Sequence, residues 1–162
     1  MGLMKLATYY RRRGGDVRFF KGDLKIFAAQ LLCEEFLAEV NDPKLGKHVP
    51  KLAEHIKTGK FAPLDAIPNF RNSDQESLLK KYRLRYRDNR FPQFDVIGIT
   101  TLFTFYWRGT IDTINFAKKF CSETGRIIVG GIAASILHER LVQETGIAPI
   151  CGLLQTGHAG CR

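Results

Sequence analysis

The stretch from Phe94 to Ser135 constrains the fold more than any other part of the chain. Its first apolar run, residues 94–100, lacks polar alternation at Val96–Ile99, which is typical of a strand covered on both faces. Residues 111–121 place their apolar side chains on one helical stripe, and Gly125 is expected to end that helix. A second β-branched run follows at Ile127–Val129. Strand, helix and strand in this order predict a βαβ unit, and therefore an α/β fold with a doubly wound parallel sheet.

Helical periodicity dominates the segment at about 21–93, which separates two predicted strands. A short strand is predicted at residues 16–20, where apolar and polar side chains alternate, and a final strand at residues 147–154. Residues 60–72, which contain two prolines, read as a loop. Helices are predicted at residues 2–13, 24–40, 50–58, 73–86 and 137–144. We expect one domain over residues 1–154, with a helical insertion at about 21–93 and an irregular tail at 155–162.

Composition narrows the class of protein. The 162 residues suffice for one domain with a proper core. The sequence has no apolar run long enough to cross a membrane and no signal-peptide layout at its N-terminus, so we expect a cytoplasmic protein with no membrane partner. Four cysteines match no zinc or iron–sulfur spacing, and we interpret them as free thiols, mostly buried.

The net charge of +9 is concentrated in two clusters, Arg11–Arg13 and Lys80–Arg90. Such clusters can bind phosphate backbones, but they can also be solvated helix faces. Leu79, Tyr82 and Tyr86 recur through the second cluster at helical spacing, as in a packed helix. We favour the solvated face and do not expect nucleic acid as a partner.

Ligands of parallel α/β sheets bind beyond the carboxyl ends of the strands. That rule nominates Thr100–Arg108 and Gly130–Ser135, which follow the two strands of the βαβ unit. Neither segment contains the Gly-x-Gly-x-x-Gly fingerprint or a phosphate-loop lysine. Hydroxyl groups followed by apolar side chains, as at Thr100–Thr104, suit a large and partly apolar ligand. A tight strand-to-helix turn accounts for Gly130-Gly131 equally well.

At these residues the sequence resembles the cobalamin-binding (Rossmann-like, flavodoxin-like) domain of methionine synthase, methylmalonyl-CoA mutase and many radical S-adenosylmethionine enzymes. That family has one strand that ends in Ser/Thr-x-Leu and a later strand that ends in Gly-Gly before small residues. The matching segments are Ile97–Leu102 and Ile128–Ser135. Residues 2–10, Gly14 and Asp16-Val17 look like the first helix and second strand of the domains that precede radical S-adenosylmethionine barrels.

The resemblance implies that the two turns flank the nucleotide tail of cobalamin. Thr100 would offer its hydroxyl to the tail, Leu102 an apolar wall, and Gly130-Gly131 the space for the tail to pass. The alternative roles are a strand cap for Thr100 and core packing for Leu102. The implied cofactor-binding residues are Thr100, Thr101, Leu102, Phe103, Gly130, Gly131, Ala133 and Ser135.

The chain also departs from the family pattern. The first strand of the family is missing, and with it the loop that carries Asp-x-His-x-x-Gly in some members. No histidine of this chain has that context, and the Cys-x-x-x-Cys-x-x-Cys motif is absent, so S-adenosylmethionine and the iron–sulfur cluster belong only to the full-length parent. We therefore expect a truncated piece of a radical S-adenosylmethionine enzyme, with the barrel normally fused downstream, that holds cobalamin and is not catalytic alone.

Two alternatives remain at this point. One is a basic interaction or nucleic-acid-binding module that uses Lys80–Arg90. The other is a nucleotide-dependent enzyme on the same fold, which ranks last because the sequence offers no phosphate motif and no paired acid and base.

Overall fold

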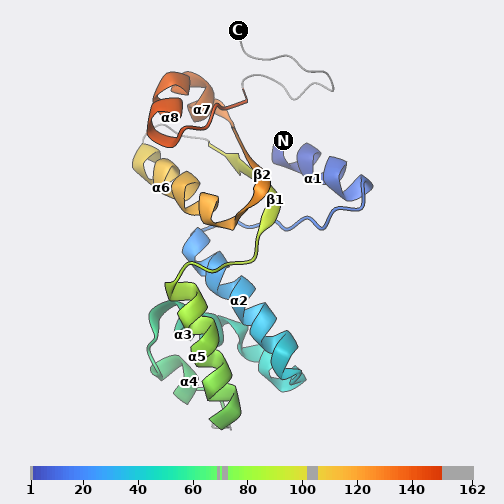
Figure 1. The fold of residues 1–162 in the computed structure, drawn as a ribbon, viewed down its shortest axis with the longest axis vertical. Coiled ribbons are helices and arrows are strands. Elements are labelled where there is room, and N and C mark those ends of the chain that lie inside the picture. The colour runs from blue at the N-terminus through green and yellow to red at the C-terminus, as the bar shows by residue number, and fades with distance from the viewer. Residues whose placement is uncertain (1, 69, 71–72, 102–105, 151–162) are drawn as a thin grey trace. The chain divides into compact units, whose positions relative to one another are not determined.

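A computed structural model describes residues 2–68, 70, 73–101 and 106–150 (Figure 1). The chain divides into two compact units. The first contains residues 1–19 and 93–162, and the second is Phe20–Pro92, which has nearly the bounds of the predicted helical insertion. The fold is mixed α/β with a two-stranded parallel sheet.

The first unit is built on the predicted βαβ motif. Strand β1 (Phe94–Thr100) pairs in parallel with β2 (Cys121–Gly130), and Ile99 lies opposite Val129 in the register. The crossover between them consists of α6 (Trp107–Ala117) and the short 3₁₀ helix η3 (Lys118–Phe120). The parallel pair and its helical crossover are thus confirmed, whereas the doubly wound sheet of more strands stays a prediction.

Helices cover the two faces of this sheet (Figure 1). On one face, α6 and α8 (His138–Thr145) enclose a core with β2, and the Trp107 indole N–H donates to the Glu144 carboxylate over 3.1 Å. On the other face lies α1 (Gly2–Arg12), whose Tyr10 hydroxyl accepts a hydrogen bond of 2.7 Å from Arg126. Arg126 alternates with the core-facing residues of β2, as the two-residue period of a strand requires. The core residues on the α6 side are Trp107, Ile111, Ile114, Val129, Ala134 and Leu141.

The predicted strand at residues 16–20 is wrong. The segment takes no regular secondary structure, although Arg11 donates to the Val17 carbonyl and lies over the Phe19 ring. Phe19 is 49% exposed, so the alternation buries too little apolar surface to favour a strand.

The predicted end of the crossover helix is also wrong. The helix stops before Cys121, which begins β2, and Gly125 lies within that strand and not at a helix terminus. The register between β1 and β2 is irregular here, since Phe94 pairs with Cys121 and Val96 with Arg126. A Cβ at Gly125 would approach the Phe94 carbonyl oxygen within 2.9 Å, so the bulge requires this glycine.

The second unit is helical. Its main helices are α2 (Leu24–Val40), α3 (Val49–Thr58) and α5 (Ser73–Arg87), which contact one another pairwise. Asp23 caps α2 by accepting from the Lys25 amide. The predicted helices 24–40, 50–58 and 73–86 are confirmed within a residue. Buried side chains from all three helices form the core, including Leu32, Phe36, Leu52, Ile56 and Leu79.

Several short elements escaped the sequence prediction. These are the 3₁₀ helix η1 (Pro43–His48), α4 (Ala62–Asp65) and α7 (Ile132–Ile136). Of the predicted last strand, residues 147–150 contribute a single parallel bridge from Ile150 to Gly130, and residues 151–154 lie outside the described part of the chain. Among the described helices, none is both long and apolar enough to cross a membrane.

Candidate functional site

The two turns nominated by the sequence lie together at the carboxyl edge of the sheet. Thr100, the last residue of β1, stands opposite Gly130, the last residue of β2. Gly131 follows with φ 107° and ψ 176° and leads into α7. The two predicted turns therefore start side by side at the same edge of the sheet, as adjacent parallel strands demand.

Hydrogen bonds of Thr101 connect the two turns. Its side chain is buried, and its hydroxyl donates to the Gly130 carbonyl over 3.1 Å. The same oxygen accepts a hydrogen bond of 2.9 Å from the Ala134 amide, at the start of α7. The Thr101 amide also donates to the Gly130 carbonyl, over 2.8 Å. The hydroxyl thus donates one bond and accepts another within the protein.

Gly130 and Gly131 differ in what the fold demands of them. A Cβ on Gly131 would lie 2.2 Å from the Thr101 carbonyl oxygen, and its backbone angles belong to a region that only glycine occupies readily. Among the described residues, a Cβ on Gly130 would meet only the Ile150 carbonyl oxygen, at an ordinary 3.6 Å. The described part of the fold therefore requires a glycine at position 131 but not at position 130.

The other predicted site residues have different surroundings. Thr100 and Ser135 are exposed, and the Ser135 hydroxyl donates to the Gly131 carbonyl. Ala133 is fully buried and belongs to the core, so its side chain does not face the surface of the turns. Leu102 and Phe103 lie outside the described residues.

Sequence reasoning missed an apolar surface beside these turns. Ile132 and Ile136 are one helical turn apart on α7 and are 64% and 66% exposed. Tyr106, which directly precedes α6, is exposed to a similar degree. The sequence contains the pattern of this surface, because two isoleucines four residues apart follow the glycines. The pattern does not identify an exposed surface, since the same spacing also fits a buried helix.

Replacing Thr101 with valine is expected to lower the free energy of unfolding by about 1–3 kcal/mol, because the Ala134 amide would be buried without an acceptor. Thr101→Ser keeps the hydroxyl and should retain most of that stability. Urea denaturation followed by Trp107 fluorescence measures both. Equal losses in the two variants would contradict the assigned role of the hydroxyl.

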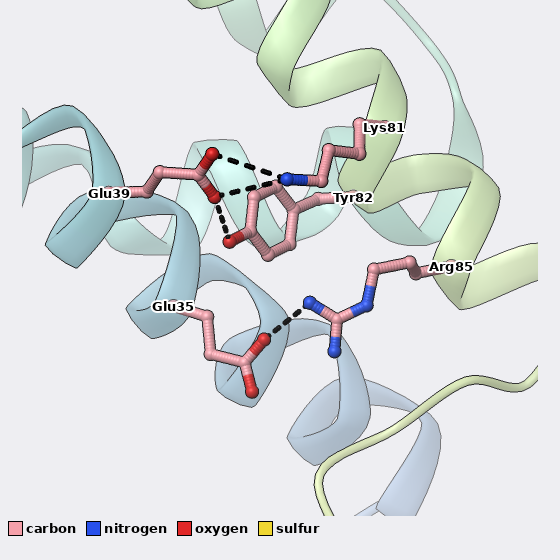
Figure 2. A network of polar contacts seen from close by, with 5 residues as sticks. All are labelled: Glu35, Glu39, Lys81, Tyr82 and Arg85. Carbon is pink, nitrogen blue, oxygen red and sulfur yellow. Dashed lines mark hydrogen bonds and ion pairs between the residues drawn. The ribbon is translucent and has the colours of Figure 1, made fainter.

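Part of the basic cluster on α5 pairs with acidic side chains of α2 within the second unit (Figure 2). Lys81 pairs with Glu39 of α2 at 3.2 Å, and Arg85 pairs with Glu35 of the same helix. The Tyr82 hydroxyl donates to Glu39 over 2.7 Å, and burial together with this bond raises the pKa of Tyr82 to about 12. The cluster is thus part of a helix–helix contact, which supports the packed-helix interpretation.

This network predicts a pH dependence. The hydrogen bond from Tyr82, followed by that from Lys81, lowers the pKa of Glu39, so the folded state binds this proton less readily than the unfolded state does. The resulting stabilisation is present above the ordinary carboxyl pKa of about 4.3 and is lost as pH falls through the lowered value. Glu39→Gln should therefore lower the urea midpoint at neutral pH and change it little in acid.

The control for that experiment is Glu54→Gln, which removes an exposed carboxylate from α3. Circular dichroism follows the helical unit in both variants. The prediction would be contradicted if the urea midpoints of wild type and Glu39→Gln differed by the same amount at neutral and at acid pH.

The described residues include no group of three or more histidine, cysteine, aspartate or glutamate side chains that could hold a metal ion. Buried His55 has its Nδ1 bound to the Lys60 carbonyl at 2.7 Å. Cys33 is a free, buried thiol whose pKa is raised to about 12, chiefly by burial, and Cys121 is free and half-buried. The surroundings of these three side chains are those of packed residues and do not indicate a metal site.

Comparisons with family models, with curated proteins and with solved structures find no match to this chain.

Proposed function

We propose that this chain is a cobalamin-binding-type α/β domain of a radical S-adenosylmethionine enzyme, which holds the corrinoid and is not catalytic alone. The observation that carries the proposal is the meeting of the Thr100–Thr101 and Gly130–Gly131 turns at the carboxyl edge of a parallel βαβ unit. Ligands of parallel α/β sheets bind at this edge. The resemblance of the same two turns to the cobalamin-binding family supplies the identity of the ligand.

The side chains at this edge fit a large ligand with an apolar ring and a polar tail. Gly130 lacks a side chain although the described residues leave room for one, which favours the close approach of another group. Exposed Ile132 and Ile136 offer an apolar wall next to it, and the exposed Thr100 offers a hydroxyl.

Thr101 and Gly131 have a supporting role in this proposal. The Thr101 hydroxyl bonds to Gly130 and Ala134 and thereby holds the two turns at a fixed separation. Cobalamin, when bound, supplies the alkyl or electron transfer, while the chain orients it and excludes water. Thr100, Gly130 and Ile132 are the residues that would contact it.

Titration of the purified protein with hydroxocobalamin, followed by gel filtration and a visible spectrum, tests the proposal. We expect one corrinoid to be retained per chain. Thr100→Trp should abolish retention because the indole fills the surface beside Gly130. Glu123→Trp places the same side chain at an exposed position near the opposite end of β2 and should retain the corrinoid.

Two outcomes would contradict the proposal. The first is a folded monomer that retains no corrinoid. The second is retention that survives Thr100→Trp, since the ligand would then occupy another part of the chain.

A further inference from the structure

The outer face of α1 forms a shallow hollow of about 520 Å³ that the corrinoid proposal does not use. The side chains that line it recur at positions four and one residues apart, so they share one side of the helix. We define the outer α1 face as Met4, Lys5, Thr8, Tyr9 and Arg12 together with Arg13, which directly follows the helix.

This face is separate from the side of α1 that packs on the sheet. Ala7 is buried, Leu3 lies against Gly98 of β1, and the Tyr10 hydroxyl accepts from Arg126. The outer face, in contrast, leaves Met4 66% and Tyr9 44% exposed. The packing of α1 on the sheet therefore uses the opposite side of the helix and does not bury the outer face.

Among the described residues, no ion pair joins Lys5, Arg12 or Arg13 of the outer α1 face to a carboxylate. Residues 1–15 contain no aspartate or glutamate. The next acid, Asp16, pairs with Arg18 at 3.6 Å. This arrangement differs from that on α5, where Lys81 and Arg85 pair with glutamates of α2.

An aromatic ring stands among these cations in a fixed orientation. The Tyr9 ring meets Tyr10 edge-on at 5.2 Å, and Tyr10 is in turn held by Arg126. The Arg13 guanidinium lies over the Tyr9 ring, 4.2 Å from its centroid. Lys5 and Arg12 stand about 10 Å apart along the helix axis, on either side of Tyr9.

We propose that the outer α1 face binds single-stranded nucleic acid. Cations that track a phosphate backbone, together with an aromatic or guanidinium plane on which a base stacks, are what such binding requires. Unpaired bases are needed for the stacking, so a single strand fits better than a duplex. An anionic membrane fits less well because insertion needs a broad apolar face, and Met4 and Tyr9 are the only large apolar side chains of this one.

Fluorescence anisotropy with fluorescein-labelled oligo(dT) tests the proposal on the full chain. Three phosphate contacts predict that log K falls with log salt at a slope of about −2, since each contributes about −0.7 on single strands. The triple variant Lys5→Gln/Arg12→Gln/Arg13→Gln should bind at least about tenfold more weakly, and its log K should no longer fall with log salt. Tyr9→Ala should weaken binding about tenfold and leave the slope unchanged.

The matched control is Lys44→Gln/Lys47→Gln/Lys60→Gln, which removes the same charge from exposed positions of the second unit. It should keep most of the affinity. An equal loss in this control would overturn the proposal, because net charge alone would then explain binding. Equal or tighter binding to duplex DNA, to polyglutamate or to vesicles containing phosphatidylserine would overturn it as well.

Discussion

Replacing Gly131 with alanine is expected to lower the free energy of unfolding by about 3 kcal/mol or more. Its φ of 107° with ψ of 176° costs any other residue about 1–3 kcal/mol. The new methyl group would also lie 2.2 Å from the Thr101 carbonyl oxygen, so the turn after β1 must shift and its hydrogen bonds to Gly130 and Ala134 would weaken. Urea denaturation followed by Trp107 fluorescence measures this loss, since Trp107 lies in the core of the same unit.

Gly130→Ala is the matched control for this experiment. Its methyl group would make an ordinary contact with the Ile150 carbonyl, so we expect a change within about 0.5 kcal/mol. A loss at position 130 as large as that at position 131 would contradict the geometry described for the two turns.

The second large effect is expected in the helical unit. Phe36 is fully buried on α2, and its ring meets that of Tyr82 from α5 edge-on at 5.9 Å. Phe36→Ala removes this contact and leaves a cavity, which costs about 3–5 kcal/mol in a well-packed core. Circular dichroism in urea measures the change. Hydrogen exchange should become faster at amides of α2, α3 and α5.

Phe61→Ala provides the comparison, because Phe61 belongs to the same unit and its side chain is mostly exposed. We expect it to cost less than about 1 kcal/mol. Similar losses from Phe36→Ala and Phe61→Ala would show that the core of this unit lies elsewhere.

The sequence predicts the long, strongly periodic elements of this fold correctly. The run Val96–Ile99 and the stripe that includes Ile111 and Ile114 suffice for the parallel βαβ unit, because buried strands and amphipathic helices have distinct periods. The strand prediction at residues 16–20 fails because the segment is short. Alternation over five residues carries little information when Phe19 is left exposed.

The candidate site is predictable in place but not in detail. The carboxyl-edge rule nominates two turns from residue types alone, and the structure places Thr100 opposite Gly130 at that edge. It does not distinguish Gly131, where the Thr101 backbone leaves no room for a side chain, from Gly130, where the described residues leave such room. That distinction depends on a close approach between residues thirty positions apart, and no local pattern encodes such a contact.

The same limit applies to the two basic clusters. The sequence does not show which basic side chains of Arg11–Arg13 and Lys80–Arg90 are paired, because the acids that pair with Lys81 and Arg85 lie on α2, far away along the chain. Only the tertiary structure reveals that Lys81 and Arg85 are paired. The outer α1 face is the better candidate for an anionic partner.

Hydrogen exchange with and without hydroxocobalamin is the most direct test of a corrinoid site at the two turns. Bound corrinoid should slow exchange at the carboxyl ends of β1 and β2 and along α7, while amides of α2, α3 and α5 exchange as before. Slower exchange confined to the helical unit, or no change anywhere in a folded protein at saturating corrinoid, would contradict the proposed site.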